Sequence, residues 1–334
     1  MESSIIGVPL IRLPRWGVAI LCFIGILICF SIHVYARSVL TIRFQIKDTL
    51  FLTCIQFIAY FIPSAPMGLK IVRKEVSMKS NIWIYFLTSI FLSLSMSLTN
   101  FATFRLSGST ESLFKSTRLV PVMIGNIIIV QRTPKFYAVL SLCLITIGLV
   151  ALSITDIASS SRSDIHGIIA VMLSLSFDSI AFSLEEKLML HEGASQSEVL
   201  SFVYGIGATS VGIIALVTGA FQSGISNIIH SPSSLVPLII YIVTGAVGIQ
   251  FVFLSVKVFG SLTACIFTSL RKTIFTVYRM RSHFSVFNGI SLAILTCGIA
   301  IHVFSDIEEE KELFTSMNNP NILSDIGEFE VIDD

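Results

Sequence analysis

The sequence alternates between long apolar stretches and short polar connections over most of its length. A helix needs about 20 consecutive apolar residues to cross a bilayer, and each stretch is close to this length. We therefore predict ten membrane-spanning helices, at approximately residues 16–35, 49–69, 82–102, 109–130, 137–155, 165–187, 199–220, 235–256, 258–278 and 286–304.

The composition supports this interpretation. The chain is 54% hydrophobic and only 13% charged, whereas soluble globular chains carry about 25% charged residues. We expect an all-α polytopic membrane protein whose main partner is the lipid bilayer, and no nucleic-acid partner. The six cysteines lie in apolar stretches without CxxC spacing, so we expect buried thiols and no metal site or cofactor.

Topology follows from the distribution of basic residues. The first stretch, 16–35, is too long for the core of a signal peptide, so we interpret it as a retained anchor. Short connections on the N-terminal side of the membrane carry more Lys and Arg than those on the other side, which places the N-terminus in the cytosol. Ten crossings return the chain to the same side. Residues 1–15 are then a cytosolic N-terminus, and residues 305–334 form an acidic cytosolic tail.

Two apolar stretches contain a similar basic motif. Phe114, Ser116 and Arg118 have the same spacing as Phe267, Ser269 and Arg271. The motifs lie in the fourth and ninth predicted helices, and a shift of five helices inverts topology. We therefore predict two inverted five-helix repeats, residues 16–155 and 165–304. This plan is common in secondary transporters, which place the substrate site at the repeat interface.

The basic residues of these motifs are the candidate binding residues: Lys115, Arg118, Arg271 and Lys272. A cation at bilayer depth costs roughly 2.5–3.5 kcal/mol on insertion scales unless it faces a cavity or a partner. Arg offers a rigid fork for phosphate or sulfate, and Lys adds a compact charge. One alternative is that these side chains reach towards the head groups. Another is that Lys115 pairs with Glu111, four residues earlier.

Acidic residues on the sixth stretch provide candidates for a gate or a counter-ion. Asp178 and Glu185 are seven residues apart and share one helix face. Glu185 or Glu186 could hold the site closed when it is empty, although Glu186 and Lys187 can equally mark the end of the helix. The sequence shows no Ser-His-Asp order, HExxH motif or P-loop, so we expect no enzyme.

Three segments resemble motifs of the nucleotide-sugar transporter family, in the branch that includes carriers of 3′-phosphoadenosine 5′-phosphosulfate (PAPS) and of UDP-galactose. The segment Lys115–Met123 resembles the family's KSxKxIPVM motif. The segments Glu186–Met189 and Ala194–Val199 resemble its EKxM and ASxSE motifs. The segments Phe259–Leu262 and Thr268–Lys272 resemble its FGAL and TxxRK motifs. The chain departs from the family at Glu185, where Gln is common, and at 278–283.

This resemblance implies a drug/metabolite transporter fold of ten helices in a Golgi membrane, with the ER as the weaker choice. It implies transport of PAPS from the cytosol into the lumen, by antiport with an adenosine mono- or bisphosphate, to supply sulfotransferases. Two alternatives stay open: a UDP-sugar carrier of the same fold, and a membrane scaffold that transports nothing. The oligomeric state is open too, a homodimer included.

Overall fold

The computed structural model describes residues 4–5, 8–9, 14–46, 48–106, 114–115, 117–131, 134–157, 164–279 and 286–317. Within these ranges, the side chains of residues 4, 5, 8, 9, 104, 153, 155–157, 272–273, 275–279 and 306–317 lie outside the description. Two short strands, β1 (Ser4–Ile5) and β2 (Val8–Pro9), pair antiparallel before the first helix.

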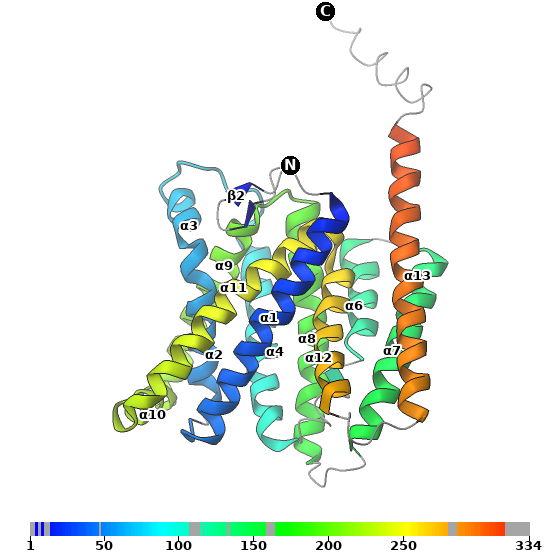
Figure 1. The fold of residues 1–334 in the computed structure, drawn as a ribbon. Coiled ribbons are helices and arrows are strands. Elements are labelled where there is room, and N and C mark those ends of the chain that lie inside the picture. Colours follow the sequence, from blue (N-terminus) through cyan, green and yellow to red (C-terminus); the bar gives the residue numbers. More distant parts are fainter. Residues whose placement is uncertain are drawn as a thin grey trace, which may run out of the picture.

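In the rest of the described chain, every element of secondary structure is a helix. Its elements are α1 (Arg15–Ile42), α2 (Thr49–Phe61), η1 (Ile62–Ser64), α3 (Ala65–Val72), α4 (Ile82–Arg105), α6 (Leu119–Gly125), η2 (Asn126–Val130), α7 (Phe136–Ile157), α8 (Ile165–Leu190), α9 (Gln196–Val217), α10 (Ala220–His230), η3 (Pro232–Ser234), α11 (Leu235–Phe259), α12 (Ser261–Arg279) and α13 (Val286–Met317). Figure 1 shows these helices as a bundle in which α1 begins and α13 ends at the same, upper end.

Seven segments of the described chain are long and apolar enough to cross a membrane: 15–42, 49–72, 82–103, 165–190, 196–217, 232–259 and 286–305. Two further apolar helices, Leu119–Val130 and Phe136–Leu152, are shorter. Large apolar side chains are exposed on the outer surface, as expected where lipid is the solvent; Trp83 is 70% exposed and Val217 is 83% exposed. The predicted all-helical, multi-pass membrane class is confirmed at this level.

The structure differs from the predicted boundaries in several places. The last helix continues thirteen residues beyond residue 304 to Met317, into the predicted acidic tail. The first helix continues seven residues beyond Tyr35 to Ile42, so Arg37 lies inside it and not in a connection. The polar connection after residue 220 contains the extra helix α10, which packs its Phe221 ring 5.8 Å from that of Phe51. Apolar residues after Arg37 and within α10 explain both helices, because each can bury one face against the bundle.

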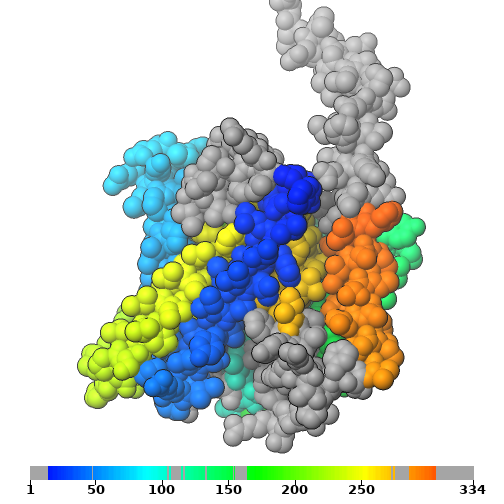
Figure 2. Space-filling model, viewed as in Figure 1, coloured from blue at the N-terminus to red at the C-terminus, as the bar shows by residue number. Residues whose placement is uncertain are grey.

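Helices far apart in the sequence form the principal pairs of the bundle. The most extensive contacts join α7 to α13, α4 to α8, α1 to α11 and α2 to α9. Figure 2 shows α1 crossing one face of the molecule between α11 and α12, with α13 farther along the same face. The largest apolar core lies between α2, α4, α8, α9 and α11 and includes Phe57, Tyr85, Val203 and Phe253.

Glycines allow the closest of these contacts. A Cβ atom on Gly148 of α7 would lie 2.9 Å from the backbone nitrogen of Leu295 in α13, and one on Gly298 would lie 2.9 Å from that of Ile145. Small residues at such crossings are typical of membrane helices whose backbones approach closely.

We expect Gly148→Ala to lower the melting temperature of the detergent-purified protein, because α7 and α13 must separate to admit the methyl group. Gly212→Ala is the matched control. Its Cβ would meet only the Sγ of Cys54 at 3.5 Å, an ordinary contact. Equal melting temperatures for the two variants would contradict the close packing of α7 on α13.

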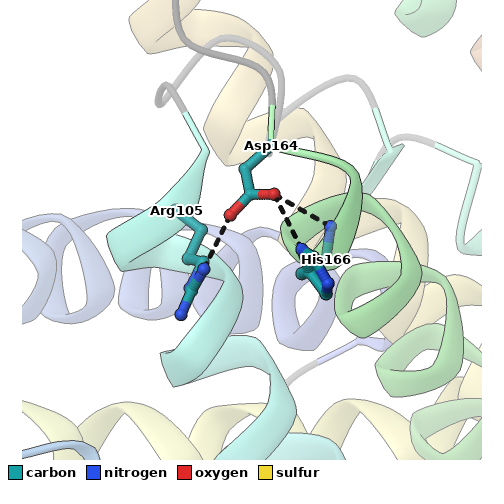
Figure 3. Close-up of polar contacts among 3 residues, drawn as sticks. All are labelled: Arg105, Asp164 and His166. Atoms are coloured by element: carbon teal, nitrogen blue, oxygen red, sulfur yellow. Dashed lines mark hydrogen bonds and ion pairs between the residues drawn. The ribbon is translucent and has the colours of Figure 1, made fainter.

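A polar cluster joins α4 to α8 at their adjoining ends (Figure 3). Arg105 Nη1 donates to Asp164 Oδ2 at 2.8 Å, and Asp164 Oδ1 accepts from the backbone N–H of His166 at 3.1 Å and lies 3.1 Å from His166 Nδ1. Asp164 thus caps the start of α8. The bonds from Arg105 and His166 lower the pKa of the Asp164 carboxyl to about 2.

This pKa predicts a pH-dependent stability difference. Because the carboxyl is more acidic in the folded chain, its contribution is complete above pH 4 and disappears as the pH falls towards 2. We expect Asp164→Asn, which keeps a capping oxygen, to melt below the wild type at pH 6. The difference should shrink steadily from pH 4 to pH 3. A difference that is constant with pH would show that the negative charge contributes nothing.

Candidate functional site

A cavity of about 240 Å³ lies within the bundle and is bounded by side chains from α1, α2, α4, α8, α9, α11 and α12 and from the segment that leads into α6. Among the described residues, four cationic side chains and one carboxylate line it: Arg37, Lys115, Arg118, Arg271 and Asp178. Four aromatic rings complete much of the wall: Phe30, Tyr60, Phe182 and Tyr204. The cavity therefore combines excess positive charge with flat apolar surfaces.

Arg118 lies at the start of α6, where Pro121 occupies the first turn and removes no helical hydrogen bond. Its Nε is 2.5 Å from Asp178 Oδ2 on α8, and its guanidinium carbon is 4.2 Å from the centroid of the Phe182 ring. The two charged side chains are only 13% and 19% exposed. The structure thus identifies Asp178 as the carboxylate that neutralises Arg118.

Arg271 lines the same cavity from α12. Its Nη1 donates to the carbonyl oxygen of Phe30 at 3.2 Å, and its guanidinium carbon is 5.8 Å from the Phe30 ring centroid. Its Nε is buried without an acceptor, and no described carboxylate pairs with it. Among the described residues, the charge of Arg271 is therefore stabilised by a carbonyl dipole and by the Phe30 ring. Lys272 follows on the same helix, but its side chain lies outside the described residues.

The remaining sequence candidates lie in different surroundings. Lys115 lines the same cavity as Arg118 and Arg271, whereas Glu111 lies outside the described residues. Glu185 is 1% exposed and neither of its carboxyl oxygens has a hydrogen-bond partner within the described part of the chain. Glu185 is not among the residues that line the cavity, and it lies seven residues, about two helical turns, beyond Asp178 on α8.

Glu186 forms a second polar cluster. Its Oε2 accepts from Asn126 Nδ2 at 3.0 Å and from the backbone N–H of Ser261 at 2.9 Å. Asn126 Oδ1 in turn accepts from the hydroxyls of Ser183 and Ser261. Gly260, with φ +86°, turns the chain between α11 and α12 so that the N-terminus of α12 faces the carboxylate. The cluster therefore fastens η2, α8 and the start of α12 together.

The two clusters form successive links between the same pair of elements. Arg118 pairs with Asp178, and eight residues later on both elements Asn126 binds Glu186. Eight residues of helix span about 12 Å, so α6–η2 and α8 run side by side in the same direction. Glu186 and Asn126 also line a second cavity of about 320 Å³ with Lys135, Gly260 and His302. The Glu186 cluster thus lies about 12 Å along the helices from the Arg118–Asp178 ion pair. It lies towards the end of the bundle where α1 begins, because Arg15 Nη2 at the start of α1 donates to the carbonyl oxygen of Val258, close to Ser261, at 3.3 Å.

Several cavity residues were not among the sequence candidates. The predicted first helix ends at Tyr35 and so leaves Arg37 outside it, whereas the apolar residues 39–42 indicate that the helix continues. Tyr60, Gln56 and Tyr204 carry no charge and lie in ordinary apolar surroundings in the sequence. Only the packing of α2 against α9 brings them to the cavity.

Comparison with known proteins adds independent information. A family model described as the UAA transporter family matches residues 18–306. The chain is 27% identical over 310 residues to "Adenosine 3'-phospho 5'-phosphosulfate transporter 2" of Aedes aegypti, which covers 90% of this chain and 79% of that protein. It is 24% identical over 276 residues to the protein of that name from Homo sapiens, covering 81% of this chain and 68% of the relative.

A solved structure also resembles the fold. One crystal structure aligns with a TM-score of 0.54 at 13% identity, covering 87% of this chain and 98% of the other. At this identity the likeness shows the fold alone. The family model and the curated relatives, which cover most of the chain, carry the evidence on function.

Proposed function

The chain belongs to the UAA transporter family, which matches it over residues 18–306, and from this premise we propose that it transports PAPS. The membership makes the chain a membrane transporter and not an enzyme. The relatives from Aedes aegypti and Homo sapiens that bear the name of a phosphosulfate transporter support the choice of substrate. The excess of cations over carboxylates in the cavity carries the proposal physically.

The charge of the cavity suits a polyanion. Four cations and one carboxylate leave a large positive excess among the described lining residues, and Lys272 is proposed to add to it. PAPS carries a phosphosulfate bridge and a 3′-phosphate, and a phosphomonoester alone contributes about 1.5 to 2 negative charges. A monoanion would leave cations buried and uncompensated, at a cost of a few kcal/mol.

The lining also suits a nucleoside. Phe30, Tyr60, Phe182 and Tyr204 offer ring faces, and stacking of a base on an aromatic side chain is worth about 1–3 kcal/mol. At about 240 Å³ the cavity is smaller than the ~300–1,000 Å³ of most ligand pockets. We propose that the substrate widens it by replacing Asp178 as the partner of Arg118, which lets α6 and α8 move apart.

We propose further that the fold consists of ten membrane helices in two inverted repeats, 16–155 and 165–304. The principal helix pairs support this arrangement. If α1, α2–α3, α4, α6–η2 and α7 correspond to α8, α9, α11, α12 and α13, the pair α1–α11 becomes the pair α8–α4. The pairs α2–α9 and α7–α13, and the weaker pair α6–α12, map onto themselves. A two-fold relation between the halves would produce this set of contacts.

The proposed mode of transport is antiport with an adenosine mono- or bisphosphate. An empty cavity with a large positive excess is costly to move through the low-dielectric centre of a bilayer, and a bound anion removes that cost. The carrier should therefore change sides only when loaded. Glu186, which binds η2 and α12 at the end where α1 begins, is the proposed gate on that side, with both chain termini in the cytosol.

The proposed location is the Golgi membrane, where luminal sulfotransferases use PAPS, with the ER membrane as the weaker choice. A homodimer is compatible with the large apolar outer surface, which the bilayer can cover equally well.

Uptake by proteoliposomes tests the function. Purified full-length protein is reconstituted with adenosine 3′,5′-bisphosphate inside, and uptake of labelled PAPS is compared with uptake of labelled UDP-galactose and with protein-free liposomes. We expect PAPS to enter many-fold faster than UDP-galactose, and faster with a loaded lumen than with an empty one. Preferred uptake of UDP-galactose would replace the proposed function with that of a UDP-sugar carrier. No uptake of either would favour the scaffold.

A further inference from the structure

The wall that α1 contributes to the cavity contains an arginine outside both basic motifs. Arg37 and Arg271 line the same cavity. Arg37 follows His33 by about one turn of α1, the His33 ring lies 5.8 Å from the Phe30 ring, and the Phe30 carbonyl oxygen accepts from Arg271 Nη1. Both arginines therefore lie along the part of α1 that borders the cavity. A buried Nη2 of Arg37 and the buried Nε of Arg271 lack acceptors within the described residues.

The described part of the cavity wall offers no carboxylate to this arginine pair. Asp178 is the one carboxylate that lines the cavity among the residues described, and Arg118 holds it at 2.5 Å. A buried guanidinium group with unused N–H donors costs free energy unless a ligand supplies acceptors. The arginine pair therefore differs from Arg118, which already has an anionic partner.

The hydroxyl of Tyr60 lines the same cavity as the arginine pair and has an unused proton. Gln56 Nε2 donates to the oxygen of Tyr60 at 2.6 Å, while Gln56 Oε1 accepts from Tyr241 at 3.0 Å. Because the Tyr60 oxygen accepts in this chain, its own O–H remains available to the cavity. Two guanidinium groups and one hydroxyl thus present only donors, which match the oxygens of a phosphomonoester dianion.

We propose that Arg37, Arg271 and Tyr60 form a phosphomonoester subsite, separate from the Arg118–Asp178 side of the cavity. The identity of the bound group rests on the proposed function. In PAPS the 3′-phosphate is the only phosphomonoester, so this subsite reads the 3′-phosphate. The singly charged phosphate and sulfate of the 5′ bridge then bind on the side of Arg118, whose charge Asp178 already balances in part.

Binding of PAPS and of adenosine 5′-phosphosulfate to purified full-length protein tests the subsite, because these ligands differ only in the 3′-phosphate. We expect the wild type to bind PAPS at least about tenfold more tightly than adenosine 5′-phosphosulfate, because the second ligand lacks the hydrogen bonds to a charged 3′-phosphate. Arg37→Gln should remove most of this preference with affinity for adenosine 5′-phosphosulfate little changed. Tyr60→Phe should reduce the preference for PAPS by a smaller factor, because this substitution removes only one hydrogen-bond donor.

Arg43→Gln is the matched control, since Arg43 follows on from the same helix but is exposed and contacts Phe44 instead of the cavity. It should keep the wild-type preference. Equal weakening of both ligands by Arg37→Gln, or no change in either, would overturn the subsite. If Arg37→Gln does not fold, Arg37→Lys takes its place, because it keeps the charge but loses the forked guanidinium donors. An undiminished preference of Arg37→Lys for PAPS over adenosine 5′-phosphosulfate would also overturn the proposal.

Failure of the proposed function has a different signature. In that case the wild type binds UDP-galactose and neither adenosine nucleotide. The subsite is then tested with UMP, which carries a phosphomonoester, against UDP-galactose, which carries none. Arg37→Gln should weaken UMP about tenfold more than UDP-galactose. An equal effect on the two uridine ligands would overturn the subsite independently of the substrate.

Discussion

We expect Arg271→Ala to abolish PAPS uptake in proteoliposomes and to leave the amount of folded protein close to that of the wild type. Arg271 has no carboxylate partner among the described residues, so its removal deprives none of their carboxylates of a charge partner. The substrate, however, loses a charge partner inside a desolvated cavity. Such a truncation costs about 2–5 kcal/mol, which is a loss of roughly 30-fold to several thousand-fold in affinity. Lys272→Ala is expected to act in the same direction.

The matched control for this variant is Arg73→Ala, which removes an exposed arginine that follows α3. It should transport PAPS at the wild-type rate, because it changes the net charge equally without touching the cavity. Size-exclusion profiles of both variants establish that they are folded. Uptake by Arg271→Ala within a few-fold of wild type would contradict the placement of substrate beside α12.

The sequence predicted Arg271 and Arg118 for a physical reason that needs no structure. Each interrupts an apolar stretch long enough to cross a bilayer, so its charge requires a cavity or a partner. Arg37 lacks this signal, because it lies close to a connection where a charge costs little. Its role depends on the continuation of α1 to Ile42 and on the approach of α12. Tertiary packing, and not the local pattern, makes it a cavity residue.

The choice among the three carboxylates of α8 was also beyond the sequence. Asp178 and Glu185 share a helix face, and Glu186 is adjacent to Glu185, so helical periodicity cannot say which one meets Arg118. The position of α6 decides it. With Arg118 beside Asp178, the next link falls at Asn126 and Glu186, and Glu185 is left buried without a hydrogen bond. The apolar stretches predicted where helices lie, but they did not predict which helices pair.

The pairing of Arg118 with Asp178 leads to a prediction that tests whether Asp178 competes with the substrate for Arg118 or positions Arg118 for the substrate. If Asp178 holds Arg118 until substrate replaces it, Asp178→Asn should destabilise the empty protein. Breaking a buried ion pair costs 3–5 kcal/mol, and we expect about 3 kcal/mol because both side chains keep some contact with solvent. The variant should melt at a lower temperature than the wild type in the absence of ligand.

The same substitution should strengthen binding of the anionic substrate. In the wild type, PAPS must displace the carboxylate before it can use Arg118, whereas in Asp178→Asn no such competition remains. The rise in melting temperature caused by PAPS should therefore be larger in Asp178→Asn than in the wild type, and absent or small in Arg118→Ala. The double variant Arg118→Ala, Asp178→Asn should recover part of the lost stability, since it leaves neither charge unpaired. If Asp178→Asn instead weakens PAPS binding as much as Arg118→Ala does, Asp178 positions the arginine for the ligand and does not compete with it.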